Sequence, residues 1–212
     1  MDQVALYLTG ILVAYGVFIM GIFSPGPNIL SIIGTSVAVG RPSGKALAMG
    51  IASGSFLWGL LAWFGLTTVL LTYASLVTAI KITGAVYLLW LAVKSFRSAA
   101  TRKELALKKL QLPTGAMGYY RRGLIIQMTN PKAALTWTAT VSLGLSPSAP
   151  WWIGGIIVLG TTLISFIGHC SYAGAFSTRP VVNAYMRSRR WIEAGLGTFF
   201  CLASYKLLTS KT

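Results

Sequence analysis

The sequence predicts an all-α polytopic membrane protein with six transmembrane helices. Of its 212 residues, 55% are hydrophobic and 10% are charged, and the mean hydropathy is +0.70. Soluble domains are usually about 25% charged. Six apolar segments reach or approach the roughly 20 helical residues that cross a bilayer. The first and the fourth of these segments are interrupted by proline, within 24–28 and 129–133.

The first apolar run extends from Val4 to Val39 and contains no charged residue. As one straight helix it would be roughly 54 Å long, whereas the hydrocarbon core of a bilayer is about 30 Å thick. We expect Ser24-Pro25-Gly26-Pro27-Asn28 to divide it into a crossing helix and a shorter helix, which either continues at an angle or is re-entrant. In lipid, the backbone groups freed by such a break must be satisfied by protein or by a water-filled cavity.

The second span is expected over 46–71 and the third over 76–93. Ala46, Gly50 and Gly54 recur every four residues in the second span. Small residues at this spacing let membrane helices pack closely. We therefore predict a packing face on this helix.

Aromatic and then basic residues end the third span. Tyr87 and Trp90 precede Lys94 and Arg97, which is the order expected at a membrane interface. We interpret Tyr87 as part of this anchor; the alternative is that it lines a substrate path.

The segment 97–122 is the longest polar stretch, and most of its charges are basic. Its part 98–112 mixes leucines with Lys and Arg, which predicts either a short surface helix attracted to anionic lipid headgroups or a mobile loop. A nucleic-acid-binding role would require a folded basic face, and no soluble domain is predicted that could carry one.

The fourth span begins after Gly123 and ends near Leu145, with its proline break about a third of the way along. The fifth span is expected over 153–176 and the sixth over 191–208. Between these two spans, 179–190 reads as a short loop with four arginines.

The distribution of basic residues predicts the topology. With six spans, most of them fall on the side of the central segment, which is therefore expected to be cytoplasmic, with both termini outside. Each half contains a proline-broken helix, a long glycine-rich span and a shorter third span, and an odd number of spans requires the second half to be inverted. We predict two inverted three-helix repeats, 1–96 and 123–212, joined by the basic cytoplasmic loop 97–122.

Four motifs occur in order along the chain: Ser24-Pro25-Gly26-Pro27-Asn28, Arg41…Gly44…Ala48…Gly50…Gly54, Gly84-Ala85-Val86-Tyr87-Leu88-Leu89-Trp90-Leu91 and Asn130-Pro131-Lys132-Ala133. In these motifs, and in its hydropathy pattern over 4–208, the chain resembles the LysE/RhtB family of amino-acid exporters. The resemblance implies a secondary transporter of the bacterial inner membrane that expels amino acids or close derivatives and is driven by the proton gradient. The sequence departs from this expectation in one respect. No Asp or Glu lies within a predicted span, and Glu193 is placed at the cytoplasmic start of the sixth, so no carboxylate inside the membrane is expected to relay protons.

The two proline breaks supply the predicted binding site. Helix N-termini carry unpaired N–H groups and partial positive charge, which suit the carboxylate of an amino acid, and proline is favoured in the first helical turn. The alternative is that the prolines only kink the helices and the asparagines satisfy freed carbonyls. The predicted substrate-binding residues are Ser24, Pro25, Gly26, Pro27, Asn28, Asn130, Pro131 and Lys132.

Two of the predicted site residues are titratable. Charged residues inside a membrane are costly and usually functional, so Lys132 is expected to bind the carboxylate; otherwise it extends to the interface or bonds freed carbonyls. His169 is the candidate for proton coupling because histidine changes charge near neutral pH. Its alternative is a packed, hydrogen-bonded residue.

Two other classes of function remain open at this stage. The first is a thiol–disulfide electron carrier, which would have to use Cys170 and Cys201. These two cysteines form no CxxC pair and lie away from the proline breaks. The second is a non-transporting membrane scaffold, which would bind lipid or a partner through the basic segment. No cofactor and no metal site are expected. A homodimer that forms through glycine-lined faces is expected.

Overall fold

The computed structural model describes residues 3–24, 26–72, 74–101, 115–145 and 149–209. Within these ranges all regular elements are α-helices, in agreement with the predicted fold class. The helices are α1 (Gln3–Phe23), α2 (Pro27–Ala38), α3 (Arg41–Thr72), α4 (Ala74–Ala100), α5 (Gly115–Met128), α6 (Pro131–Gly144), α7 (Trp151–Ala175) and α8 (Arg179–Thr209).

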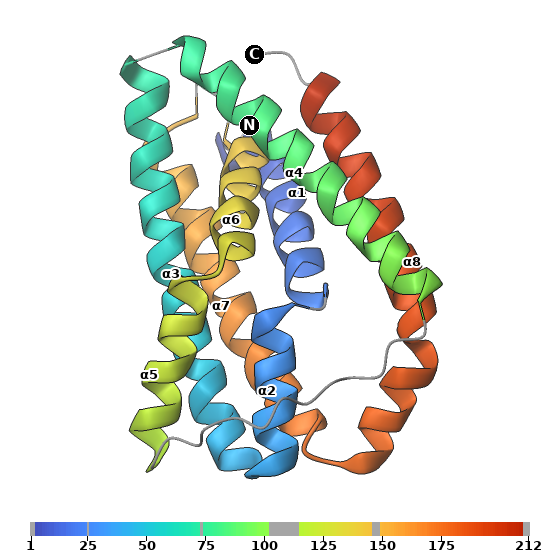
Figure 1. Ribbon diagram of the computed structural model, residues 1–212. Helices are drawn as coiled ribbons and strands as arrows, with labels where there is room; N and C mark the ends of the chain where they lie inside the picture. The colour runs from blue at the N-terminus through green and yellow to red at the C-terminus, as the bar shows by residue number, and fades with distance from the viewer. Residues whose placement is uncertain (1–2, 25, 73, 102–114, 146–148, 210–212) are drawn as a thin grey trace.

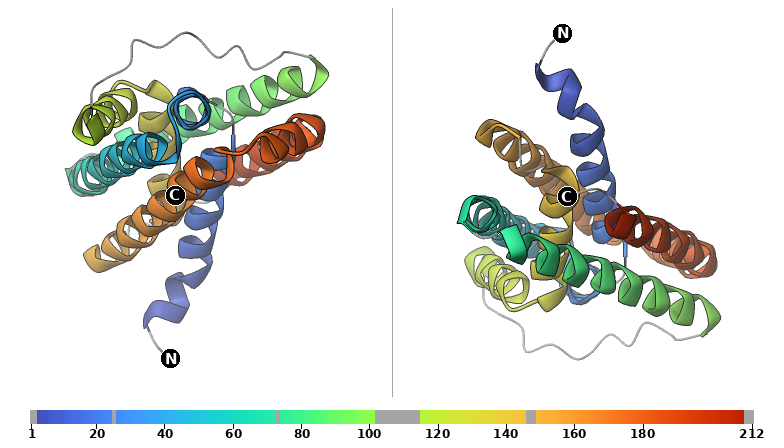
Figure 2. Two further views of the ribbon diagram at one scale, coloured as in Figure 1. Left: turned by 90° about the horizontal axis from the view of Figure 1, so that it is seen from below. Right: turned by 90° about the horizontal axis from the view of Figure 1, so that it is seen from above.

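The helices run between two ends of one bundle (Figure 1). α1 begins at the upper end, and α2 continues from it toward the lower end, so the first break does not turn the chain back. α5 and α6 follow one another in the opposite direction. α4 and α8 pack against each other along one side of the bundle, and α3 packs against both α5 and α7 (Figure 2).

Among the described residues, three helices are long and apolar enough to cross a membrane, judged by length and composition. Their apolar windows are Leu6–Phe23 in α1, Arg41–Gly65 in α3 and Trp151–Ala175 in α7. On α7, the side chains of Leu159, Leu163 and Ile167 are more than 60% exposed at four-residue intervals. A helix that is apolar on its outer face as well as its inner one is typical of a membrane span, so the structure supports a polytopic membrane protein.

Glycines bring α3 and α5 into close contact. A Cβ at Gly50 would lie 1.9 Å from the Tyr120 carbonyl oxygen, and one at Gly54 would lie 2.9 Å from Gln127 Cβ. From the α5 side, a Cβ at Gly123 would lie 2.1 Å from a carbonyl oxygen of α3. The predicted packing face of this helix is confirmed, and it fixes α5 just before the second proline.

The helices also extend into stretches expected to be loops. α5 begins at Gly115, and α8 begins at Arg179, so the arginine-rich segment before the sixth predicted span is helical. Pro180 stands in the first turn of α8, where its missing N–H would be unpaired in any case. Residues 102–114, which include most of the predicted surface segment, lie outside the described residues.

α6 and the C-terminal half of α1 lie at the centre of the bundle, whereas the start of α1 projects from it (Figure 2). Trp137 and Val141 of α6 belong to an apolar cluster shared with α2, α3 and α7, whereas Ala139 belongs to a second cluster shared with α4 and α8. In the chain breaks that precede α2 and α6, Ser24 and Asn130 are buried, whereas Thr129 is exposed.

Candidate functional site

The two chain breaks contact each other directly. The first break is defined as residues 24–26, between α1 and α2, and the second as Thr129 and Asn130, between α5 and α6. Asn130 Nδ2 donates to Asn28 Oδ1 at 3.1 Å, and Asn28 Nδ2 donates in turn to Gln127 Oε1. A chain of side-chain amides thus joins two segments that are about 100 residues apart in the sequence.

The prolines begin the helices that follow the breaks, as predicted. α2 begins at Pro27 and α6 at Pro131. The N-terminus of α6 is capped, because Asn130 Oδ1 accepts a hydrogen bond from the Lys132 backbone N–H at 3.0 Å. The N-cap of α2 is Gly26, which makes no side-chain cap. The two helix N-termini are therefore satisfied differently.

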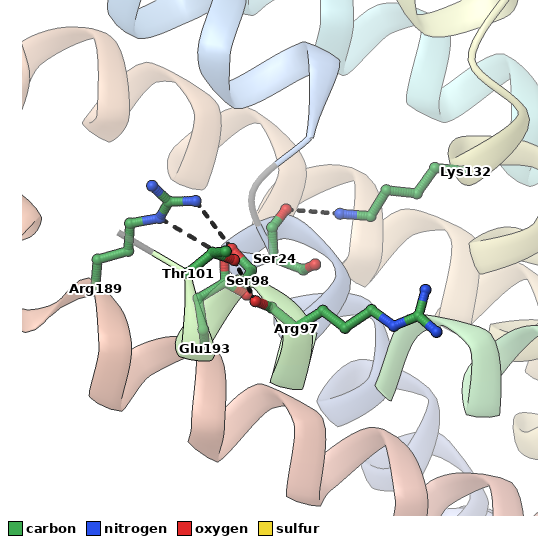
Figure 3. A network of polar contacts seen from close by, with 7 residues as sticks. All are labelled: Ser24, Arg97, Ser98, Thr101, Lys132, Arg189 and Glu193. Carbon is green, nitrogen blue, oxygen red and sulfur yellow. Dashed lines mark hydrogen bonds and ion pairs between the residues drawn. The ribbon is translucent and has the colours of Figure 1, made fainter. Parts of the chain in front are cut away.

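The Lys132 side chain extends from the second break to the first (Figure 3). Its Nζ donates to the Ser24 carbonyl oxygen at 2.6 Å. Ser24 directly follows α1, whose last carbonyls have no intrahelical partner and carry partial negative charge. Gly26 leaves room for the lysine, since a Cβ at that position would lie 3.3 Å from Lys132 Cδ and 3.4 Å from Nζ. Lys132 thus bonds a backbone carbonyl freed by the first break, which was one of the alternatives to binding the substrate carboxylate.

Tyr87 is buried at the second break, and its interpretation as an interfacial anchor is wrong. The side chain is 5% exposed, and its hydroxyl donates to the Lys132 carbonyl oxygen at 3.0 Å. Trp90 is exposed and carries Lys94 Nζ 4.9 Å from its ring centroid, as expected of an anchor. The small residues Gly84, Ala92 and Ser95, which are buried on the same helix, were the available signal that this face points inward.

Gln127 is a site residue that the sequence analysis did not identify. It is 3% exposed; its side chain accepts from Asn28, and its backbone carbonyl accepts from Trp58 Nε1 at 3.1 Å. A glutamine in an apolar run, one turn before Asn130, was a usable signal. Ser55, which accepts a hydrogen bond from Trp137 Nε1 at 3.1 Å, gave none.

A cavity of about 40 Å³ lies where the breaks meet. Its polar wall includes both breaks, Gln127 and Lys132, and its apolar wall includes Phe18 and Trp137. A buried water needs roughly 10–15 Å³ of such volume, so the cavity has room for a few waters. A larger guest enters only if the hydrogen bonds across the breaks rearrange.

His169 of α7 lines the same cavity and is 3% exposed. Its Nδ1 lies 2.9 Å from the Ser165 carbonyl oxygen and 3.1 Å from Ser165 Oγ. Because a carbonyl can only accept, the shorter bond places a proton on Nδ1 and leaves Nε2 as the acceptor of the neutral ring. His169 is therefore both a packed residue and a cavity residue.

Glu193 is buried within α8, in the part of the helix predicted to begin the sixth span. Its side chain is 2% exposed, and Oε1 accepts from Ser98 Oγ at 2.8 Å. Arg189 Nη2 donates to Ser98 Oγ at 2.9 Å, and Arg189 Nε lies 3.9 Å from Glu193 Oε1. This network joins the last turns of α4 to α8 (Figure 3).

The other predicted residues have no role that the structure reveals. Pro25 lies outside the described residues. Cys170 on α7 and Cys201 on α8 are free thiols. In the described part of the chain, no group of three or more His, Cys, Asp or Glu side chains is placed to hold a metal ion.

Residues 19–211 match the family described as LysE type translocator. The chain is 32% identical over 206 residues to the uncharacterized membrane protein YahN of Escherichia coli K12. The matched region covers 96% of this chain and 89% of YahN. The chain is 26% identical over 200 residues to the threonine efflux protein of Salmonella typhi (92% and 95% covered), and 32% identical over 161 residues to the leucine efflux protein of Salmonella choleraesuis (74% and 75% covered). No solved structure matches. The family resemblance seen in the four motifs is confirmed, and the chain belongs to the LysE type translocators.

Proposed function

We propose that this protein exports neutral amino acids from the cytoplasm through the cavity between its two breaks. The observation that carries the proposal is the direct contact of the breaks around that cavity, through Asn130, Asn28 and the Lys132–Ser24 hydrogen bond. Broken helices that meet inside a membrane protein are typical of substrate sites in secondary transporters. The threonine and leucine efflux proteins to which the chain is similar support an amino-acid substrate.

In this proposal the substrate carboxylate binds at the N-terminus of α2 and to Lys132. The first N–H groups of a helix attract anions, and those of α2 have no side-chain cap. The N-terminus of α6 contributes less, because Asn130 already caps it. Of the predicted site residues, Ser24, Gly26, Asn28, Asn130 and Lys132 line the cavity, whereas Pro27 and Pro131 do not; the proposed contacts to substrate are therefore limited to these five.

The cavity favours a neutral side chain over a cationic one. Its lining among the described residues includes no Asp or Glu, and a buried cation without a partner is strongly disfavoured. Phe18, Ile22, Ile29 and Trp137 form an apolar wall that suits a leucine-like or threonine-like side chain. Lysine and arginine are therefore not expected as substrates.

The proposal includes six membrane crossings in two inverted repeats, 1–96 and 123–212, with the basic segment on the cytoplasmic side. It is supported by the opposite directions in which α1–α2 and α5–α6 run through the bundle (Figure 1). It also includes proton coupling at His169, because Nε2 of this cavity residue is available to accept a proton.

The test is efflux from proteoliposomes preloaded with radiolabelled leucine, threonine or lysine, with and without an imposed pH gradient. We expect saturable flux of leucine or threonine and none of lysine. Lys132→Ala should reduce the flux at least about tenfold, since a charge-assisted hydrogen bond contributes about 1.5–3 kcal/mol. Lys206→Ala, on the exposed face of α8, is the matched control. Absence of saturable amino-acid flux in the unmodified protein would contradict the proposal.

His169→Gln tests the coupling separately. We expect this variant to retain downhill exchange of amino acid but to lose its response to the pH gradient. Transport that still responds to the gradient would exclude His169 as the proton carrier and leave the export proposal standing.

A further inference from the structure

The bond between Lys132 and Ser24 places a primary ammonium group on the carbonyl end of a helix at the cavity wall. At 2.6 Å the bond is slightly shorter than the roughly 2.7–2.9 Å that is typical of charge-assisted N–H···O hydrogen bonds. The partial negative charge at the C-terminus of α1 favours a cation there. Because only the ammonium group and the carbonyl take part, the Ser24 carbonyl is suited to any alkylammonium group that fits beside it.

An amino acid brings a second ammonium group into the same cavity, and this group needs hydrogen-bond acceptors once it leaves water. The side-chain amide oxygens are already engaged: Asn28 Oδ1 accepts from Asn130, and Gln127 Oε1 accepts from Asn28. The described lining residues offer no carboxylate, and Nε2 of His169 is already assigned to the proton in the proposed coupling. The Ser24 carbonyl differs from these acceptors because its present partner is itself an ammonium group.

We propose that the substrate inserts into the Lys132–Ser24 hydrogen bond. The substrate's ammonium takes the place of the lysine on the Ser24 carbonyl, and the released lysine binds the substrate's carboxylate. This inference rests on the proposed amino-acid export and adds an ammonium subsite to it. The exchange leaves no buried charge without a partner, because the lysine gains an anion and the carbonyl keeps a cation.

The surroundings of Lys132 permit such an exchange. Its side chain starts at the second residue of α6 and reaches the first break on a flexible four-carbon chain. Gly26 adds no side chain beside it, since the nearest contacts of a Cβ there would be Lys132 Cδ and Nζ. Tyr87 and Asn130 bond only the backbone of Lys132, so the side chain can move while α6 stays in place.

The experiment separates the two halves of the substrate. Leucinol keeps the ammonium of leucine and lacks the carboxylate, whereas leucic acid keeps the carboxylate and carries a hydroxyl in place of the ammonium. Binding of each compound to the purified, detergent-solubilised protein is measured by its effect on thermal stability. The unmodified protein is compared with Lys132→Met, with Lys132→Gln as a second neutral variant and with Lys206→Met as the control.

Opposite shifts are expected in the two neutral variants. Leucinol should bind these variants at least about tenfold more tightly than it binds the unmodified protein, because the lysine that competes for the Ser24 carbonyl is gone. Leucic acid should bind them at least about tenfold more weakly, because the Lys132 ammonium that pairs with its carboxylate is gone. Lys206→Met should change neither. Shifts in the same direction, or leucinol binding that is absent or unchanged, would overturn the inference. If leucine flux persists in that case, only the ammonium subsite is wrong; if no amino acid is carried, the export proposal fails with it.

Discussion

The two chain breaks look alike in the sequence, but their helix ends are satisfied in different ways. The second break satisfies itself: Asn130 caps α6, and the backbone N–H of Ala133 bonds the Asn130 carbonyl at 2.9 Å. The first break has no such cap on α2, and the carbonyl that ends α1 is bonded by Lys132 from the other break.

This difference assigns separate tasks to the two breaks. The second is held in place, since glycine contacts fix α5 against α3 and Tyr87 bonds the start of α6. The first lies at the cavity wall, and in the proposed site it offers backbone groups of both signs, the N–H groups of α2 and the carbonyl of Ser24. In the proposed function the first break is therefore the receptor for the two charged groups of an amino acid, and the second break is its support.

The largest expected effect comes from Asn28→Ala, which separates the breaks. Asn28 accepts from Asn130 and donates to Gln127, and its loss leaves two buried amide groups unpaired at about 1–3 kcal/mol each. We expect the free energy of unfolding to fall by about 2–4 kcal/mol and export to fall at least about tenfold. Thermal unfolding in detergent and proteoliposome flux measure the two effects.

The control for that variant is Asn183→Ala, on the exposed face of α8. Both readouts should remain at the level of the unmodified protein. An Asn28→Ala protein as stable and as active as this control would show that the amide chain does not hold the breaks together.

Asn130→Ala should have a smaller effect, on the second break. It removes the cap of α6, typically about 1 kcal/mol, and one bond to Asn28, but it leaves the Asn28–Gln127 bond. We expect the free energy of unfolding to fall by about 1–2 kcal/mol and the affinity for substrate to change less than with Asn28→Ala. If Asn130→Ala loses more stability than Asn28→Ala, the second break would not be the support of the first, and the two roles would be reversed.

Gly26→Ser makes the first break resemble the second by giving α2 a side-chain cap. The extended backbone there, with φ −158° and ψ −175°, accepts serine. The added Cβ would lie 3.3 Å from Lys132 Cδ, so the flexible lysine must shift slightly. A serine hydroxyl can bond the N–H groups proposed to bind the carboxylate. We expect stability within about 1 kcal/mol of the unmodified protein and affinity lowered about three- to tenfold. Thermal unfolding and concentration-dependent flux report the two quantities.

The matched control is Gly195→Ser, because nothing lies within 4 Å of a Cβ added at that position. Unchanged affinity in Gly26→Ser would mean that the α2 N-terminus does not receive the carboxylate.

The sequence was informative where one residue type determines the local backbone. Pro27 and Pro131 start helices because proline is favoured in a first turn and disrupts the helix further along. Gly50 and Gly54 identified a packing face because only small side chains allow such an approach. In each case the physical reason acts within a few residues of the chain.

The sequence was misleading where a role depends on a partner far along the chain. Tyr87 has the sequence surroundings of an anchor, yet its partner is the backbone of Lys132, 45 residues away. The segment 179–190 was expected to be a loop because of its four arginines, but it forms the first part of α8. Arginine is a good helix former, so charge alone did not mark a loop there.

The smallest expected effect is that of Ser24→Ala. Lys132 bonds the carbonyl of Ser24 and not its hydroxyl, so removing the hydroxyl leaves the proposed ammonium acceptor intact. We expect export and affinity within about twofold of the unmodified protein, since one neutral hydrogen bond contributes only about 0.5–1.5 kcal/mol. Thr129→Val is the corresponding change at the second break, where the hydroxyl bonds the Ile125 carbonyl of its own helix at 2.7 Å. A large loss in Ser24→Ala with none in Thr129→Val would mean that the first break acts through a side chain, and the contrast between a backbone receptor and its support would not hold.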